Sequence, residues 1–125
     1  IMDVDHTNDY IDDFYSDSGF KLLIVFNDIE KSDNESIDEL KSIIRFCNEN
    51  QITIYPLTAS KTQNVEEFSK KYNLNIPFYY GDKTNLKSII RSNPGLVLLQ
   101  KNVVIENWPS TRLPSEKQLS KLTIQ

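Results

Sequence analysis

The residues near the start of the chain have the types and spacing of a phosphoryl-transfer site. Asp3 and Asp5 are separated by one residue, and Thr7 follows two positions after Asp5. The first carboxylate of such a pair can attack phosphorus, and the second can act as acid and base beside a Mg²⁺ ion. Thr58 ends an apolar run and Asp82 follows another, as a phosphate-binding hydroxyl and a metal-binding carboxylate would. One interpretation of the chain is therefore a Mg²⁺-dependent phosphohydrolase.

This interpretation requires the motif to end a buried central strand. The spacing resembles the nucleophile motif of haloacid-dehalogenase-type phosphatases, but only two residues precede Asp3. Short acidic motifs also arise often by chance. Asp9, Asp12 and Asp13 continue the acidic composition. The alternative interpretation is an acidic, solvated N-terminal segment.

Sulfur and imidazole chemistry are restricted by composition. The chain contains one cysteine, Cys47, and one histidine, His6. It therefore has no internal disulfide, no His-rich metal site and no second imidazole base. Cys47 continues a helical stripe formed by Ile37, Leu40 and Ile44, which predicts core packing for its thiol. We expect neither a metal ion nor a cofactor, and we assign no catalytic residue.

Apolar runs alternate with helical stripes along the rest of the chain, which predicts an α/β domain. Residues 1–19 are predicted to form an acidic helical segment, with Thr7 as a helix cap, ahead of a domain over residues 20–125. Ser60 to Gln63 has the pattern of a capping box. Predicted strands cover 20–26, 52–57, 76–80, 96–99 and 103–108, and predicted helices cover 35–50, 60–73, 85–92 (with Leu86, Ile89 and Ile90 inward) and a last helix capped by Ser115.

Pro94 separates the third domain helix from the following strand. A proline cannot donate a backbone hydrogen bond and disfavours a helical conformation at Asn93, so the helix must end by Ser92. We expect the Asn93–Pro94 peptide bond to be cis. Lys101–Asn102 is predicted to be a two-residue hairpin turn. The element order predicts a mixed sheet with parallel crossovers first and an antiparallel hairpin last.

Three stretches, residues 57–60, 82–96 and 104–108, resemble the thioredoxin-like domain at the C-terminus of some bacterial DoxX-family membrane proteins. The resemblance implies a thioredoxin-like fold, a central mixed sheet flanked by helices, with the helical segment added at the N-terminus. The chain is more distantly similar to TlpA-type thiol-disulfide oxidoreductases and peroxiredoxins.

In those oxidoreductases the first core strand leads into a Cys-x-x-Cys motif. The corresponding positions are Lys31 and Asn34, with Ser32 and Asp33 between them. Thiol-disulfide exchange needs a thiolate with a lowered pKa, and this stretch contains no sulfur. The resemblance therefore implies a domain without dithiol chemistry. A relative with residual thiol activity is the alternative.

The same resemblance implies a groove for a protein or peptide partner. In thioredoxins the residue before the cis proline presents its backbone to an extended peptide. The matching positions here are Asn93 and Pro94, with Lys31 to Asn34 as the opposite wall. The alternative is that Pro94 only shapes a turn.

Charge and hydropathy limit the remaining partners. The formal net charge is −4 and the 14 Lys and Arg residues are scattered, which argues against a nucleic-acid partner. No apolar run approaches the ~20 residues that cross a bilayer. The chain begins at Ile1 in mid-pattern, so we expect a piece of a longer protein. By resemblance, its upstream segments would anchor it in a bacterial inner membrane, with the domain on the periplasmic side. The oligomeric state stays open.

Overall fold

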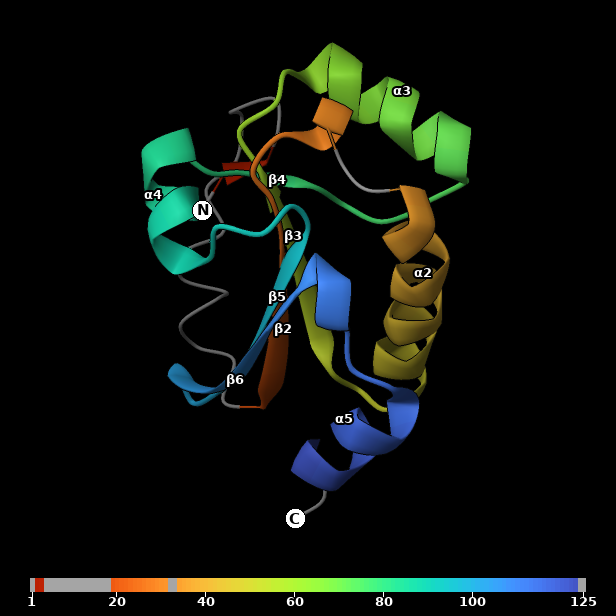
Figure 1. Cartoon of the computed structure of the whole chain (residues 1–125), viewed down its shortest axis with the longest axis vertical. Helices are drawn as coiled ribbons and strands as arrows, with labels where there is room; N and C mark the ends of the chain where they lie inside the picture. Colours follow the sequence, from red (N-terminus) through yellow and green to blue (C-terminus); the bar gives the residue numbers. More distant parts are fainter. Residues whose placement is uncertain (1, 4–18, 32–33, 124–125) are drawn as a thin grey trace.

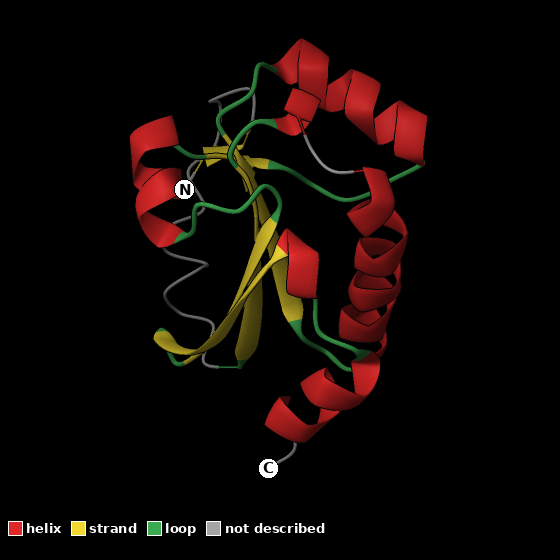
Figure 2. Ribbon diagram, in the orientation of Figure 1, coloured by secondary structure: helices red, strands yellow, loops and turns green. Residues whose placement is uncertain are grey.

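The computed structural model describes residues 2–3, 19–31 and 34–123. Six strands form one sheet in the order β1-β4-β3-β2-β5-β6, with helices on both faces (Figures 1 and 2). The strands are β1 (Met2–Asp3), β2 (Phe20–Phe26), β3 (Thr53–Thr58), β4 (Tyr79–Tyr80), β5 (Gly95–Gln100) and β6 (Val103–Pro109). The helices are α2 (Asn34–Glu49), α3 (Thr62–Tyr72), α4 (Lys83–Ile89) and α5 (Glu116–Thr123), with 3-10 turns η1 (Ile29–Lys31) and η2 (Ser110–Arg112).

β2 lies at the centre of the sheet because its side chains are apolar on both faces. It pairs in parallel with β3 and antiparallel with β5, while β6 forms the antiparallel edge. This arrangement confirms the predicted sheet. Because β2, β3 and β4 are parallel, their carboxyl ends meet at one edge. The amino end of β5 and the carboxyl end of β6 reach the same edge, since Gly95 pairs with both Val25 and Pro109.

The two faces of the sheet have separate apolar clusters. Leu22, Ile24 and Phe26 pack with side chains of α2, α3 and α5, whereas Leu23 and Val25 pack with Leu86 of α4. Figure 1 shows α2 and α4 on opposite sides of the sheet. The predicted stripe of α2 is confirmed, since Ile37, Leu40, Ile44 and Cys47 are all buried.

The terminal hairpin has the predicted two-residue turn. Lys101 and Asn102 have φ values of 52° and 66°, which two-residue turns joining twisted strands require. A bulge interrupts the β5–β6 register between Leu98 and Leu99. One buried residue breaks the apolar pattern of β2: Lys21 is fully buried, and its ammonium group donates a hydrogen bond to the Asn102 side chain.

Two helix starts differ from the prediction. Lys61 is the N-cap residue of α3 and makes no side-chain capping bond, so the predicted capping box at Ser60 is wrong. α4 starts earlier than predicted because the Asp82 carboxylate accepts hydrogen bonds from the N–H groups of Thr84 and Asn85, at 3.2 and 3.4 Å. α4 has seven residues. Only Leu86 of this short helix is buried, and Ile89, predicted to face inward, is 43% exposed.

The predicted N-terminal helix and the boundary at residue 19 fall largely outside the described residues. The part that is described, β1, pairs antiparallel with β4 at the edge of the sheet. No helix within the described ranges is long and apolar enough to span a membrane.

Candidate functional site

Three loops converge at the edge where the parallel strands end. Asn27 and Asp28 follow β2, Ser60 follows β3, and Asn93 precedes β5. Crevices beyond the carboxyl ends of parallel strands are the usual ligand sites of open α/β sheets. This edge is therefore the candidate functional site.

The Asn93 side chain is paired with the main chain of Asp28. Its Oδ1 accepts a hydrogen bond from the Asp28 N–H at 3.3 Å, and its Nδ2 donates to the Asp28 carbonyl oxygen at 2.5 Å. The side-chain amide of Asn93 thus makes the pair of hydrogen bonds with the Asp28 main chain that a neighbouring strand would make. It joins the loop before β5 to the loop that leads into residues 31–34.

A second side chain, that of Asn27, is hydrogen-bonded to the same loop before β5. Asn27 is 6% exposed, and its Nδ2 donates to the carbonyl oxygens of Ile90 and Ser92, at 2.9 and 3.1 Å. The hydroxyl of Ser92 lies 3.0 Å from the Pro94 carbonyl oxygen and accepts a hydrogen bond from the Ser110 N–H at 2.7 Å. The loop around Pro94 is therefore held on three sides. Pro94 is buried, and the Asn93–Pro94 peptide bond is cis.

The main chain of Asn93, unlike its side chain, has no hydrogen-bond partner among the described residues. No hydrogen bond among residues 19–31 and 34–123 engages the main-chain N–H or C=O of Asn93. Asn93 is half-buried, at the rim of the site. Its main chain can therefore offer one donor and one acceptor to another backbone.

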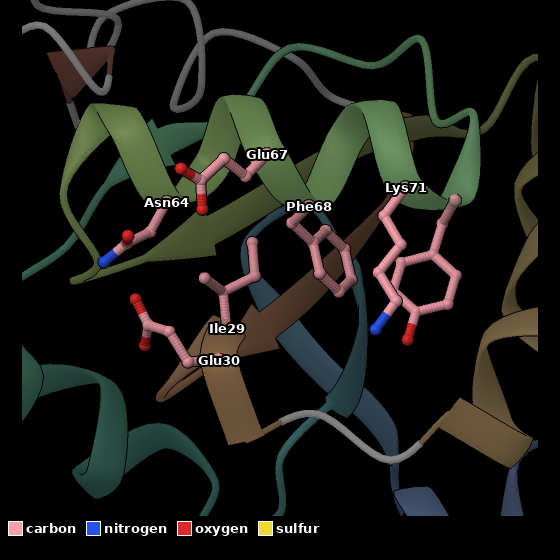
Figure 3. Close-up of a pocket in the computed structure, with 7 residues that line it drawn as sticks. Ile29, Glu30, Asn64, Glu67, Phe68 and Lys71 are labelled. Carbon is pink, nitrogen blue, oxygen red and sulfur yellow. The ribbon is translucent and has the colours of Figure 1, made fainter.

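Two hollows adjoin this edge on the β3 side. The first, about 170 Å³, lies between η1 and α3 (Figure 3). Glu30 points from η1 toward Asn64 and Glu67 of α3. The second, about 200 Å³, shares Glu30 and Asn64 with the first and extends toward Lys83 at the start of α4. Both hollows adjoin α3, because Asn64 of that helix lines each of them.

The predicted site residues are only partly placed by the structure. Lys31 ends η1 and Asn34 begins α2, while Ser32 and Asp33 lie outside the described residues. Asn93 contacts the loop between β2 and η1. Its partner there is Asp28, which lies three residues before Lys31 in the sequence.

Sequence reasoning missed Asn27, Asp28, Ser60 and Ser110. The signal that could have found the first three is their position directly after a parallel strand. Ser110 follows an antiparallel edge strand, and no local pattern indicates that it reaches Ser92.

Cys47 lies away from this edge. It is fully buried in the interior of α2, and burial raises the pKa of its thiol to about 12. A thiol becomes nucleophilic only as the thiolate. The predicted core role of Cys47 is confirmed by its place in the apolar cluster.

The phosphohydrolase interpretation is wrong. Asp3 ends a two-residue strand at the edge of the sheet, antiparallel to β4, and not a central strand. Thr58 is fully buried, and its hydroxyl accepts a hydrogen bond from the Ser60 N–H. The Asp82 carboxylate caps α4. Asp5 and Thr7 lie outside the described residues.

Metal binding has no support in the part of the chain that the structure describes. No group of three or more His, Cys, Asp or Glu side chains is placed there to hold an ion.

No family model matches the chain, and no curated protein matches it. Similar solved structures exist. The thioredoxin domain of a thiol-disulfide oxidoreductase from Bacteroides vulgatus has a TM-score of 0.68 at 12% identity, covering 98% of this chain and 91% of that one. StoA from Bacillus subtilis has a TM-score of 0.62 at 17% identity, with 86% and 84% covered. A secreted disulfide oxidoreductase from Mycobacterium tuberculosis has a TM-score of 0.60 at 17% identity, with 85% and 81% covered. The chain therefore has a thioredoxin-like fold.

Proposed function

We propose that this domain binds an extended polypeptide across Asn93 and performs no disulfide exchange. The observation that carries the proposal is the main chain of Asn93, which makes no hydrogen bond within the described residues, on a loop that the side chains of Asn27, Ser92 and Asn93 hold in place. A strand-like peptide can pair with one exposed N–H and C=O, as in other cases of strand addition. Lys31 to Asn34 would form the opposite wall of this groove.

The fixed loop favours binding because little conformational freedom is lost when the partner arrives. Asn27, Ser92 and Asn93 hold the loop before a ligand is present. The partner's side chains are not specified by this main-chain contact. The domain would therefore accept a range of unfolded or extended segments.

We also propose that the domain belongs to a DoxX-type bacterial membrane protein and faces the periplasm. The support is the resemblance of residues 57–60, 82–96 and 104–108. The secreted oxidoreductase from Mycobacterium tuberculosis is compatible with an extracytoplasmic setting. The coding sequence upstream of Ile1 tests this proposal. Four apolar segments there would support it, and a soluble domain in their place would contradict it.

The binding proposal is tested by titrating the domain with reduced, carboxymethylated α-lactalbumin, a permanently unfolded polypeptide. Isothermal titration calorimetry measures the Kd, because the tryptophans of α-lactalbumin would mask the emission of Trp108, the single tryptophan of the domain. Asn93→Ala removes the side-chain hydrogen bonds to Asp28 that hold the loop. We expect the Kd of this variant for the polypeptide to rise about tenfold, the equivalent of ~1.4 kcal/mol. Asn107→Ala, an exposed amide on β6, is the matched control and should leave Kd unchanged. Equal binding by both variants would contradict the proposal.

A second candidate is a thiol-disulfide oxidoreductase relative with residual activity. The fold neighbours favour it, because several are described as oxidoreductases. It would require Cys47, the single thiol, to leave the core.

Insulin reduction by dithiothreitol separates the two candidates. We expect the same rate with and without the domain, because a buried thiol with a raised pKa supplies no thiolate. Catalysed turnover that disappears in Cys47→Ala would establish the second candidate.

A further inference from the structure

A third hollow, of about 450 Å³, lies between strand β6, the turn η2 and helix α5. Hollows of about 300–1,000 Å³ are the usual size of small-molecule sites. This hollow is separate from the loop at Asn93, because none of the side chains that hold that loop lines it. Its lining residues therefore form a second candidate site.

Trp108 gives the hollow an aromatic wall. It is half-buried and packs against the apolar cluster that contains Leu119 of α5. Because it pairs with Leu96, a member of the same cluster, its indole lies on the α5 face of β6, where the hollow opens. Its indole N–H makes no hydrogen bond within the described residues and, unlike Asn27 Oδ1, is not a buried atom. The wall therefore presents a donor at the surface.

Two polar side chains of the hollow are held by hydrogen bonds that use only part of each group. Gln118 Oε1 accepts a hydrogen bond from the Ser115 N–H at 2.9 Å, in a capping box at the start of α5. Glu106 Oε1 accepts one from the Asn107 N–H at 3.0 Å. In the part of the chain that the structure describes, Gln118 Nε2 and Glu106 Oε2 make no hydrogen bond. One donor group and one acceptor are therefore oriented before a ligand arrives.

The charged side chains of the hollow balance each other. Glu106 supplies a carboxylate and Arg112 a guanidinium, and both side chains are exposed. A ligand with a full charge would be attracted by one of these groups and repelled by the other. Neutral hydroxyl groups can donate to the carboxylate and accept from the guanidinium, the amide and the indole. The lining therefore favours a neutral ligand that is rich in hydroxyl groups.

We propose that this hollow binds a neutral sugar, with one face of a pyranose ring on Trp108 and its hydroxyl groups on Glu106, Arg112 and Gln118. A pyranose ring has a face of C–H groups and a rim of hydroxyls that both donate and accept. This combination matches an aromatic wall surrounded by polar side chains.

A neighbouring hollow extends the same surface. Its volume is about 350 Å³, it shares Leu113 and Gln118 with the first, and it reaches Glu39 and Ser42 of α2. The continuation favours a glycan of two or more rings over a free monosaccharide. Neither hollow includes Asn93, so this site does not depend on the polypeptide-binding proposal.

Fluorescence and NMR titrations with sugars test the proposal, because Trp108 is the single tryptophan and sugars do not emit in its range. The probes are cellobiose, maltose, lactose and chitobiose. Glucose serves as the single ring, and mannitol as an open-chain polyol without a ring face. We expect a saturable change in Trp108 emission and in its indole N–H shift with at least one disaccharide. Glucose should bind severalfold more weakly, and mannitol at least about tenfold more weakly.

Three results would overturn the proposal. The first is the absence of a saturable change with any of the disaccharides. The second is mannitol binding equal to that of the best disaccharide, which would exclude stacking on Trp108. The third is equal binding of glucose, which would exclude a glycan of two or more rings.

Two variants check the polar side chains without disturbing the core. Arg112→Met removes an exposed guanidinium, and Gln118→Glu removes the amide donor while a glutamate can keep the capping bond to Ser115. Each should weaken binding of the disaccharide severalfold. Arg45→Met, at an exposed arginine on α2, is the matched control and should leave binding unchanged. Unchanged binding in both Arg112→Met and Gln118→Glu would contradict the proposal.

Discussion

Two asparagine amides organise the strand-end edge at the scale of single residues. Asn93 pairs with the main chain of Asp28, and Asn27 holds the carbonyls of Ile90 and Ser92. The sequence indicated Asn93 through its place before a proline. It could not indicate Asn27, because the acceptors are 63 and 65 positions away along the chain. Partners brought together only by the fold leave no local pattern.

Cys47 gives a prediction about stability and pH. Burial holds the pKa of its thiol at about 12, against an ordinary value of 9.0. In the unfolded chain the thiol ionises first, so the stability that this group contributes is complete below pH 9 and is lost as the pH rises toward 12. Urea unfolding at a series of pH values measures this loss.

The variant Cys47→Ala isolates the thiol from other groups that titrate in this range. At pH 8 we expect it to be less stable than the parent by about 1 kcal/mol, through lost packing. Above pH 9 this difference should shrink, and can reverse, by up to about 1.4 kcal/mol per pH unit. A difference that stays constant from pH 8 to pH 11 would contradict the burial of the thiol.

At the scale of elements, the sequence predicted strands better than helix ends. Strands β2, β3 and β5 are long apolar runs, so their central place follows from burial on both faces. The start of α4 depends on the Asp82 cap. A helix of two turns also presents few side chains to the sheet, and in α4 only Leu86 is buried. The apolar pattern of Leu86, Ile89 and Ile90 therefore indicated too wide an inward face.

The junction between α4 and β5 carries a stability prediction. A Cβ atom on Gly95 would lie 2.7 Å from Cγ2 and 2.8 Å from Cδ1 of Ile90. Gly95→Ala should therefore destabilise the domain by about 1–3 kcal/mol through overpacking.

A double-mutant cycle with Ile90→Ala shows whether this contact is the cause. The cost of Gly95→Ala should fall when the Ile90 side chain is removed, so the two changes should be non-additive by at least ~0.5 kcal/mol in urea unfolding. Strictly additive costs would show that the contact with Ile90 is not the cause of the destabilisation by Gly95→Ala.

For the whole molecule, the topology was predictable and the chemistry of the site was only partly so. Alternating apolar runs, one proline and one two-residue turn define a mixed sheet with a terminal hairpin, and the fold neighbours share this architecture. Composition alone shows that the given sequence contains one cysteine and therefore no pair of thiols. Which atoms remain free at the strand-end edge became visible only with the loops in place.

The central claim is that the main chain of Asn93 receives an extended polypeptide, and one NMR measurement tests it most directly. The ¹⁵N-labelled domain is titrated with reduced, carboxymethylated α-lactalbumin while the Asn93 amide is followed. We predict a downfield proton shift and slower hydrogen exchange of the Asn93 N–H at saturation, because a new hydrogen bond forms there. An Asn93 amide with unchanged shift and exchange, while amides elsewhere respond, would contradict the claim.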